Sequence, residues 1–168
     1  MRIRAARARA LASLRAPRAM TDREPVPIRS ASAADAAGLV PLLAELGYPT
    51  REAVLATRLA KLVRGGESVF VAEERGALLG VLTVHVTPVL HRPRPVGRLT
   101  MLVVASHARG RGVGRALVTH AEGVLAASGC GLVEVTSNQR RSDAHAFYAR
   151  LGYEVTSLRF KKALVAGD

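Results

Sequence analysis

The sequence is poor in cysteine and in aromatic residues: it has one cysteine, no tryptophan and 4% aromatics in 168 residues. Because a disulfide needs two cysteines, no internal disulfide can form, which fits a reducing compartment. The aromatic side chains are too few for the stacking platform on which single-stranded nucleic acids bind. No apolar run approaches the ~20 residues of a membrane-spanning helix, so we expect a cytoplasmic protein without a membrane partner.

Acidic residues are also scarce, with 13 Asp and Glu against 25 Lys and Arg and a formal net charge of +12. Residues 1–20 hold six arginines and no acid. Three interpretations compete: a flexible basic extension, an Arg-rich targeting peptide, or sequence upstream of a true start at Met20. Arginine clusters also bind nucleic-acid phosphates, but we do not expect that partner. We expect residues 1–25 to be disordered or mis-started and residues 26–168 to form one folded domain.

Hydrophobic periodicity and turn residues predict the order of elements along that domain. They indicate a strand over 26–30, helices over 32–47 and 50–65, strands over 68–74 and 77–88, a loop over 89–97, a strand over 98–104, a helix over 112–128, a strand over 132–137, a helix over 142–151 and a last strand over 153–164. A turn at Gly76 makes the first hairpin antiparallel, whereas strand-helix-strand units after residue 98 require parallel pairing. We therefore expect an α/β fold with a mixed sheet and helices on both faces.

Three glycines on alternate positions follow the apolar run that ends at Val104 and open a helical pattern. The stretch reads Arg109-Gly110-Arg111-Gly112-Val113-Gly114-Arg115. Glycines leave backbone amides uncovered, a helix N-terminus adds unpaired N–H donors, and arginines supply fork-shaped donors. The sequence therefore predicts a phosphate-binding turn, with a Gly/Arg-rich surface loop as the plainer alternative.

The spacing of these glycines distinguishes between phosphate ligands. A dinucleotide fingerprint fails because Arg115 stands where its third glycine belongs, and no P-loop pattern is present. Arg109, Gly112 and Gly114 instead match Arg/Gln-x-x-Gly-x-Gly/Ala. That pattern resembles the pyrophosphate-binding segment of the GNAT superfamily of N-acetyltransferases.

A second motif resembles the same superfamily, whose members commonly show Ala-x-x-Phe/Leu-Tyr-x-x-x-Gly-Phe/Tyr. It is matched by Ala144, Phe147, Tyr148, Gly152 and Tyr153. Taken alone, Tyr148 on an apolar helix face is a typical core tyrosine. The two motifs together indicate membership, and the resemblance covers roughly residues 26–164. It implies the GNAT fold, acetyl-CoA as co-substrate and no metal.

The resemblance also implies roles for individual residues. An amine attacks the thioester directly, and Tyr148 is the candidate catalytic residue that stabilises the departing thiolate. Because a model phenol has a pKa of ~10 and a thiol ~8.5, complete proton transfer from it is uphill by about 2 kcal/mol. The main chain of Leu102, Val103 and Val104 is expected to bind the pantetheine arm as an added strand. The other cofactor-binding candidates are Arg109, Gly110, Arg111, Gly112, Val113, Gly114, Arg115 and Asn138.

The sequence departs from the superfamily pattern in two places. Thr100 stands where many relatives have a glutamate that acts as general base, and Glu73 and His85 are the remaining candidates. Arg141 stands where many relatives have a cofactor-contacting asparagine; Asn138 lies nearby, out of register. These departures keep an alternative open, a catalytically degenerate module that binds acyl-CoA as a sensor or regulator.

The acceptor amine is the least determined partner. Its cleft is expected between the first two helices, the 89–97 loop and the last strand. Basic residues on that rim favour a neutral or anionic acceptor, although a solvated edge explains them equally well; they are Arg92, Arg94, Arg98 and Arg159. A homodimer is a further partner that the sequence leaves open.

Overall fold

The computed structural model of the protein describes residues 26–164. The expectation for the basic tail of residues 1–25 lies outside these described residues. Within them, five strands form one sheet in the order β1-β2-β3-β4-β5. The strands are β1 (Ile28–Ser30), β2 (Ser68–Glu74), β3 (Ala77–Thr87), β4 (Val96–Val104) and β5 (Leu132–Val135). β1 to β4 pair antiparallel and β5 joins β4 in parallel, which confirms the predicted mixed sheet.

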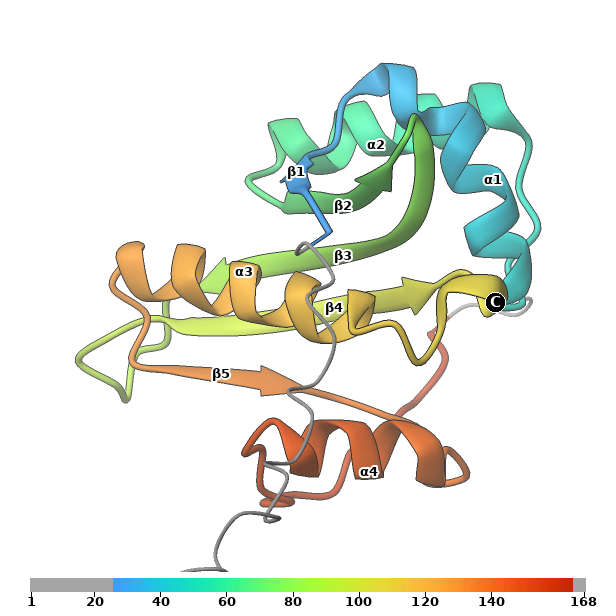
Figure 1. Ribbon diagram of the computed structural model, residues 1–168. Coiled ribbons are helices and arrows are strands. Elements are labelled where there is room, and N and C mark those ends of the chain that lie inside the picture. Colours follow the sequence, from blue (N-terminus) through green and yellow to red (C-terminus); the bar gives the residue numbers. More distant parts are fainter. Residues whose placement is uncertain (1–25, 165–168) are drawn as a thin grey trace, which may run out of the picture.

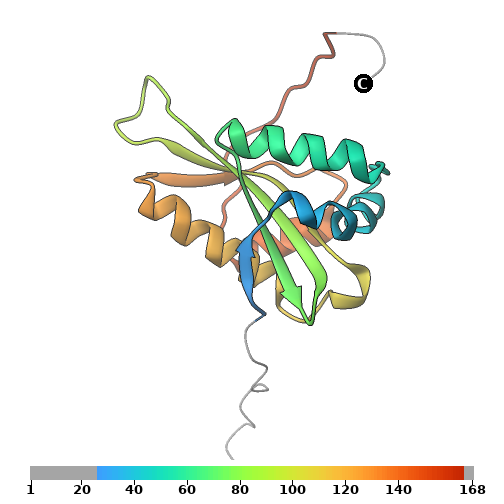
Figure 2. The same ribbon diagram turned by 90° about the horizontal axis from the view of Figure 1, so that it is seen from above.

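Helices cover both faces of this sheet, as predicted. They are α1 (Ala36–Glu45), α2 (Glu52–Arg64), α3 (Val113–Ala127) and α4 (Ser142–Arg150), with short 3-10 turns η1 (Ala33–Asp35) and η2 (Ser106–Ala108). α1 and α2 lie on one face and α3 on the other, while α4 lies beyond β5 (Figure 1 and Figure 2). The first turn of α3 lies close to α4, because Gly114 of α3 is in contact with Phe147 of α4.

The core lies on both faces of the sheet: α3 packs on one face, and Leu39, Leu42, Leu55 and Leu59 of α1 and α2 are buried on the other (Figure 2). Leu117 and Leu125 of α3 are fully buried against β3 and β4. Two strand glycines allow this close approach: a Cβ at Gly80 would lie 3.1 Å from Leu117 Cδ1, and one at Gly97 would lie 2.7 Å from Leu125 Cδ1. Real Cβ contacts are longer, so larger residues at either position would push α3 off the sheet.

Strand β4 is irregular in its middle. Its register with β3 shifts between Thr83 and Val84, so that Thr100 has no partner opposite it. Such a bulge bends a strand and increases its twist. β4 pairs with β5 only over 96–99, and among the described residues none of β5 pairs with 101–104. The two strands consequently separate toward the carboxyl end of β4, as Figure 1 shows.

One predicted element is wrong. The sequence predicts a last strand over 153–164, but the structure has no strand there. An extended segment is stabilised by ladder hydrogen bonds, and this one has no neighbouring strand to supply them. The side chains of residues 154–164 are correspondingly exposed, while Tyr153 is half-buried. Local pattern alone predicted the strand, whereas strand formation depends on a partner.

Smaller differences concern element boundaries. The helix α2 is preceded by Arg51, not capped by Thr50, whose hydroxyl donates to the Tyr48 carbonyl oxygen at 3.1 Å. β4 begins at Val96 rather than at Arg98. Boundaries are the least reliable part of a sequence-based assignment, and neither shift moves the pocket.

Candidate functional site

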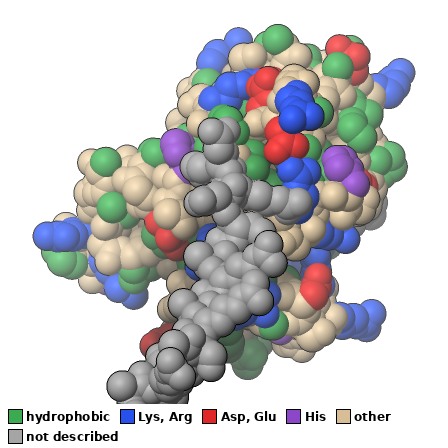
Figure 3. All heavy atoms as spheres, viewed as in Figure 1, with side chains coloured by type: hydrophobic (Ala, Val, Ile, Leu, Met, Phe, Trp, Pro, Cys, Tyr) green, Lys and Arg blue, Asp and Glu red, His purple; other side chains and the backbone are tan. Residues whose placement is uncertain are grey.

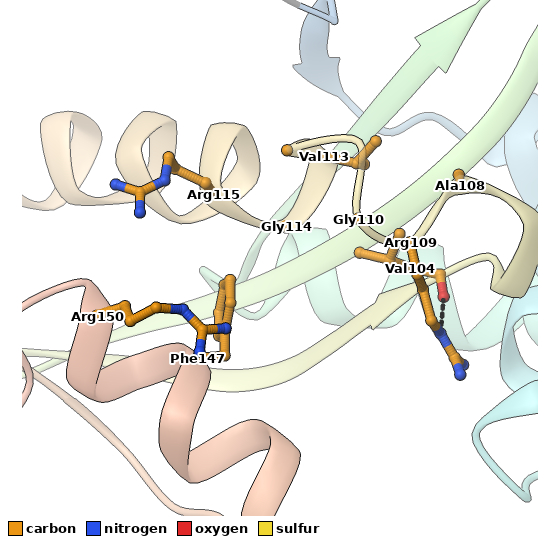
Figure 4. A pocket seen from close by; sticks show the side chains of 10 residues that line it. Val104, Ala108, Arg109, Gly110, Val113, Gly114, Arg115, Phe147 and Arg150 are labelled. Carbon is orange, nitrogen blue, oxygen red and sulfur yellow. Dashed lines mark hydrogen bonds between the residues drawn. The ribbon is translucent and has the colours of Figure 1, made fainter. Parts of the chain in front are cut away.

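A pocket of about 300 Å³ opens at the N-terminus of α3 (Figure 4). It is lined by Val104, Ala108, Arg109, Gly110, Gly112, Val113, Gly114, Arg115, Phe147 and Arg150. Seven of these ten are cofactor-binding candidates from the sequence. The structure thus gathers the end of β4, the glycine turn and one face of α4 around a single hollow.

Backbone conformation explains the glycines at the turn. Gly110 and Gly112 have φ of +73° and +85°, a region that side chains with a Cβ rarely adopt. Gly112 is the N-cap of α3, and no side chain caps this end among the described residues. The first amides of a helix have no carbonyl to bind within the helix. The amides of Val113, Gly114 and Arg115 are therefore suited to receive an anion, with the helix dipole adding positive potential.

Gly114 sets the distance between α3 and α4. A Cβ at this position would lie 3.3 Å from Phe147 Cζ and 3.6 Å from Val104 Cγ2. The absence of a side chain thus lets the Phe147 ring approach the first turn of α3 and close one wall of the pocket. Buried Ala108 and Val113 lie beside it.

Three arginines line the pocket from three elements. Arg109 donates from Nε to the Val104 carbonyl oxygen at 3.2 Å and from Nη2 to Glu45 at 3.4 Å. Arg115 comes from α3 and Arg150 from α4, and Figure 4 shows both guanidinium groups on the side of the pocket opposite Arg109. The hollow is therefore positive along its rim, which suits a phosphate group.

Arg111 is placed differently from its neighbours. Its Nη2 donates to both carboxylate oxygens of Glu74, at 2.7 and 2.9 Å, and it is absent from the pocket lining. This ion pair fastens the glycine turn to the end of β2. The structure thus gives Arg111 a positioning contact, and direct phosphate contact by this side chain stays a prediction.

Leu102, Val103 and Val104 form the part of strand β4 that β5 does not accompany. Because β5 pairs only with 96–99, main-chain groups on this edge have no ladder partner from β5. Val103 is buried and packs into the core, while Val104 lines the pocket. An extended ligand could hydrogen-bond along this edge as an additional strand.

Tyr148 lies next to the pocket but does not line it. Its ring packs edge-on against Phe147 and Tyr153, at centroid distances of 5.1 and 5.5 Å. Burial raises the pKa of the Tyr148 hydroxyl, and the nearby Arg141 charge opposes this shift. Burial also raises the pKa of Tyr153, whose hydroxyl donates to Glu122 Oε1 at 2.9 Å. Tyr148 is consequently protonated at neutral pH and available as a hydrogen-bond donor.

The candidate bases lie in different surroundings. Thr100 shares a 2.6 Å hydrogen bond with the Thr83 hydroxyl across β3 and β4. Glu73 accepts from Arg29 Nε at 2.7 Å, which ties it to the ion-paired β1 edge. His85 Nδ1 lies 3.0 Å from a Glu67 carboxylate oxygen. The structure therefore holds Glu73 in an ion pair with Arg29 and gives Thr100 a hydroxyl of β3 as its hydrogen-bond partner.

Asn138 and Arg141 both act on the start of α4. The Asn138 side-chain oxygen accepts from the Arg140 amide at 2.9 Å, and its carbonyl accepts from the Arg141 amide at 3.0 Å. Arg141 is the N-cap residue of α4. Neither residue lines the pocket, so cofactor contact by Asn138 stays a prediction.

Sequence reasoning missed Arg150 and the ring of Phe147 as pocket residues. A detectable signal was available, because the two residues are three positions apart and so share a helix face. It also missed Glu45, which accepts the Ser106 amide at 2.8 Å and binds the Arg109 guanidinium. That contact joins residues 61 apart or more, which no local pattern can predict.

No group of three or more His, Cys, Asp or Glu side chains is placed to hold a metal ion within residues 26–164. In the same range, no helix has both the length and the apolar character needed to cross a membrane.

Comparison with known proteins agrees with this geometry. The model of the acetyltransferase (GNAT) family matches residues 41–153. This range includes the glycine turn and the α4 motif, and the chain belongs to this family. The resemblance inferred from the two motifs is therefore confirmed.

Individual relatives support the same assignment. An aminoalkylphosphonate N-acetyltransferase of Salmonella typhimurium is 37% identical over 93 residues, which are 55% of this chain and 60% of that protein. The chain thus matches less than two thirds of that relative's length. A structure described as a transcriptional regulator from Bacillus halodurans has a TM-score of 0.76 and 27% identity, covering 83% of this chain and 99% of the other.

More distant structures show the shared fold. An acetyltransferase of Trypanosoma brucei has a TM-score of 0.72 and 24% identity, over 82% of this chain and 99% of the other. A glucosamine-6-phosphate N-acetyltransferase of Arabidopsis thaliana has a TM-score of 0.71 and 20% identity, over 83% and 98%. At these identities the likeness concerns the fold.

Proposed function

We propose that the protein is an acetyl-CoA-dependent N-acetyltransferase that moves an acetyl group to a primary amine. The observation that carries this proposal is the pocket where the bare amides of the glycine turn meet the unpaired edge of β4. A diphosphate fits the first feature and an extended amide-bearing arm fits the second. Coenzyme A combines the two groups in one molecule.

The turn residues would hold the pyrophosphate. Backbone amides of residues 110–115 supply donors, and Arg109 and Arg115 supply fixed positive charge beside them. Arg109 is occupied by the Val104 carbonyl oxygen and by Glu45, so it would exchange these contacts for phosphate oxygens. Charge-assisted bonds to phosphate are stronger than the 3.4 Å pair with Glu45, which favours the exchange.

The edge of β4 would align the pantetheine arm. Main-chain groups of Leu102, Val103 and Val104 hydrogen-bond its amides in the manner of a neighbouring strand. An N–H on this edge could also polarise the thioester carbonyl, as an oxyanion donor does. The bulge at Thr100 supports this arrangement because it makes β4 and β5 diverge just before these residues.

Acetyl-CoA supplies the thioester carbonyl carbon that the amine attacks; the carbon–sulfur bond breaks, an amide bond forms and the amine nitrogen loses a proton. Tyr148 donates a hydrogen bond to the sulfur as it becomes a thiolate. Its raised pKa supports this role, since the hydroxyl keeps its proton at neutral pH. The same shift disfavours complete proton transfer from Tyr148, so the proton that the thiolate finally takes up comes from the attacking amine nitrogen, which becomes the amide nitrogen.

The amine must be neutral before it attacks, and Thr100 cannot remove a proton at physiological pH. With Glu73 bound to Arg29, His85 is the titratable side chain of β3 that stays a candidate base. Deprotonation through water is the other route. Either route predicts a rate that rises with pH toward the pKa of the acceptor amine.

We propose an anionic amine as the acceptor class. The 89–97 loop carries exposed Arg92 and Arg94, whereas Arg98 of the same rim is bound to Glu134. Within residues 26–164 neither the Arg92 nor the Arg94 guanidinium group has an ion-pair partner, and two such groups suit a phosphonate or carboxylate better than a polycation. The relative from Salmonella typhimurium is named for aminoalkylphosphonates, which supports the same class.

Release of free thiol from acetyl-CoA tests the proposal. The panel pairs 2-aminoethylphosphonate with ethanolamine, which lacks the anion, and adds a polyamine and an amino acid. We expect turnover to be fastest with the anionic amines and to fall in the double variant Arg92→Ala/Arg94→Ala through KM. Equal rates across the panel would remove the acceptor assignment while leaving the transferase.

The alternative is a degenerate family member that binds acyl-CoA without transfer, which the threonine at position 100 favours. Calorimetric binding of acetyl-CoA together with no thiol release above the blank for any amine, from pH 6 to 9, would support this alternative. Absence of binding would contradict both functions.

A further inference from the structure

A row of charged side chains crosses the sheet from β2 to β5. In the register of the strands, His85 of β3 is the partner of Arg98 of β4, and Arg98 is the partner of Glu134 of β5. Glu67 directly precedes β2, and its carboxylate oxygen Oε1 lies 3.0 Å from His85 Nδ1. The charged row therefore consists, in order, of an acid, an imidazole, a guanidinium group and a second acid.

The charged row lies on the face of the sheet opposite α3. A Cβ at Gly97 would lie 2.7 Å from Leu125 of α3, so Arg98, the next residue of β4, points to the other face. That is the face on which α1 and α2 lie (Figure 2). The side chains of Arg98 and His85 are partly exposed there, at 53% and 38%. The middle of the charged row is therefore accessible to a small molecule.

His85 lies one step along β3 from the bulge of β4. Thr83, two residues before it and on the same face, shares a 2.6 Å hydrogen bond with Thr100 at that bulge. Two residues of a strand span about 7 Å. β4 and β5 separate just beyond the bulge, where residues 102–104 would hold the pantetheine arm. A proton relay through one water covers the distance between His85 and an amine held at the bulge.

The other titratable side chains of β3, β4 and β5 are Arg98 and Glu134. Arg98 is a guanidinium group that stays protonated and has no acceptor atom. Glu134 accepts a hydrogen bond from Arg98 Nε at 2.7 Å and is held in that ion pair. Within these three strands, His85 is therefore the side chain that can take a proton from an amine.

The contact with Glu67 determines which ring nitrogen of His85 is free. Nδ1 is buried and has no hydrogen bond of standard angle within residues 26–164, although Glu67 Oε1 lies only 3.0 Å away. A buried polar atom without a partner is costly, and a small rotation of the Glu67 carboxylate pairs it. Since Nδ1 is buried and the side chain is 38% exposed, the exposed part of the ring is the edge away from Nδ1. With its proton on Nδ1, the ring presents the free lone pair of Nε2 at that edge.

We propose that His85 is the general base of the reaction and that Glu67 is its positioning residue. Glu67 accepts a hydrogen bond from Nδ1–H, which fixes the ring and stabilises the positive charge that it gains. Nε2 takes a proton from the ammonium form of the acceptor through one water: the ammonium N–H bond breaks, an Nε2–H bond forms, and the electron pair stays on the amine nitrogen. The imidazolium then releases this proton to water. The inference rests on the proposed acetyl transfer and assigns its first proton to a side chain.

Thiol release combined with calorimetry tests the base. We expect His85→Ala to lower kcat about a hundredfold and to leave the Kd for acetyl-CoA within about threefold of the wild-type value. Free imidazole should raise the rate of His85→Ala several-fold, because it enters the space of the missing ring, and should leave the wild type unchanged. His120→Ala is the matched control, since His120 packs on Phe70 from α3 on the opposite face of the sheet. This control should keep the wild-type kcat and gain nothing from imidazole.

Nitrogen NMR of the His85 ring tests the positioning residue. We expect the neutral ring of the wild type to carry its proton on Nδ1, and Glu67→Ala to move it toward Nε2. The same variant should lower kcat about tenfold or more while the Kd for acetyl-CoA stays within about threefold. A merely structural role of Glu67 would leave the ring proton on Nδ1.

The outcomes separate this inference from the proposed function. A wild-type kcat in His85→Ala, or a wild-type ring with its proton on Nε2, would overturn the pair and leave the transferase standing. A wild type that releases no thiol with any amine would refute the transferase and the pair together. Should His85→Ala fail to fold, the ring proton in the wild type and in Glu67→Ala decides the inference.

Discussion

The two helices that flank the pocket are packed very differently. α3 buries five residues against the sheet, whereas α4 buries none within the described chain. The proposed phosphate-binding turn begins α3, and Tyr148 lies on α4. The pocket therefore joins a fully buried wall, which carries the proposed binding turn, to a partly exposed wall, which carries the proposed catalytic hydroxyl.

Charge is distributed over the molecule without following this division. Figure 3 shows Lys and Arg side chains scattered around the visible face, with acidic side chains beside several of them. Most described ion pairs are at or near the surface and contribute little to stability. The difference between the two walls consequently rests on apolar packing.

The largest effect is expected for Gly112→Asp on the α3 wall. A carboxylate here faces the proposed pyrophosphate, and a residue with a Cβ is strained at φ +85°. Loss of one or two charge-assisted contacts raises the Kd for acetyl-CoA by about a hundredfold or more. Calorimetric titration measures this change.

Gly129→Asp is the matched control for that experiment. Gly129 also has a positive φ, of +80°, and open space around a Cβ, but it lies after α3 and away from the pocket. The Gly129→Asp variant should reproduce the backbone strain and leave the Kd for acetyl-CoA within about twofold of the wild-type value. Equal loss of affinity in both variants would attribute the effect to the backbone and refute the phosphate-binding turn.

On the α4 wall, Tyr148→Phe is expected to act on turnover. Removing the donor lowers kcat by about a hundredfold, while the Kd for acetyl-CoA changes less than about threefold. Steady-state rates with the best amine of the panel, together with calorimetry, give the two quantities. An unchanged kcat, with chemistry shown to be rate-limiting, would end the assignment of Tyr148 to the thiolate.

The α3 wall was predictable from sequence to a greater degree than the α4 wall. Glycine spacing reports a backbone conformation directly, so Gly110, Gly112 and Gly114 could be placed before the fold was known. Arg111 could not, because its carboxylate partner Glu74 is 37 residues away. The strand over 153–164 was predicted from its pattern, but strand formation depends on a neighbour that local sequence does not report.

Core stability should show the same asymmetry between the walls. Leu117→Ala removes a fully buried side chain of α3 and is expected to cost about 2–5 kcal/mol. Leu151→Ala, at the end of α4, removes a half-buried side chain and should cost about 1 kcal/mol at low protein concentration. Urea unfolding of the two variants measures both free energies, and equal losses would mean that α4 is as well packed as α3.

Acid sensitivity is expected to arise at the β1 edge, away from both walls of the pocket. Hydrogen bonds from Arg29 to the Asp35 carboxylate, at 2.7 and 2.9 Å, lower its pKa to about 2. A carboxyl whose folded pKa is depressed stabilises the fold above its unfolded pKa of ~4, and the contribution disappears as pH falls toward 2. It amounts to about 2 kcal/mol. Urea unfolding at pH 7 and pH 3 should therefore show a smaller difference in Asp35→Asn than in the wild type.

The smallest effect is expected at alkaline pH, beside α4. Burial raises the pKa of Tyr153, and its bond to Glu122 adds to this shift. An acid whose folded pKa is raised keeps its full contribution below the unfolded pKa of ~10 and loses it as pH rises further. The unfolding free energy of the wild type should thus decline above pH 10 more steeply than that of Tyr153→Phe, measured by urea unfolding at pH 9 and pH 11. Parallel declines in the two proteins would show that Tyr153 ionises as readily in the folded chain as in the unfolded one, so that the aromatic cluster next to the pocket is open to water.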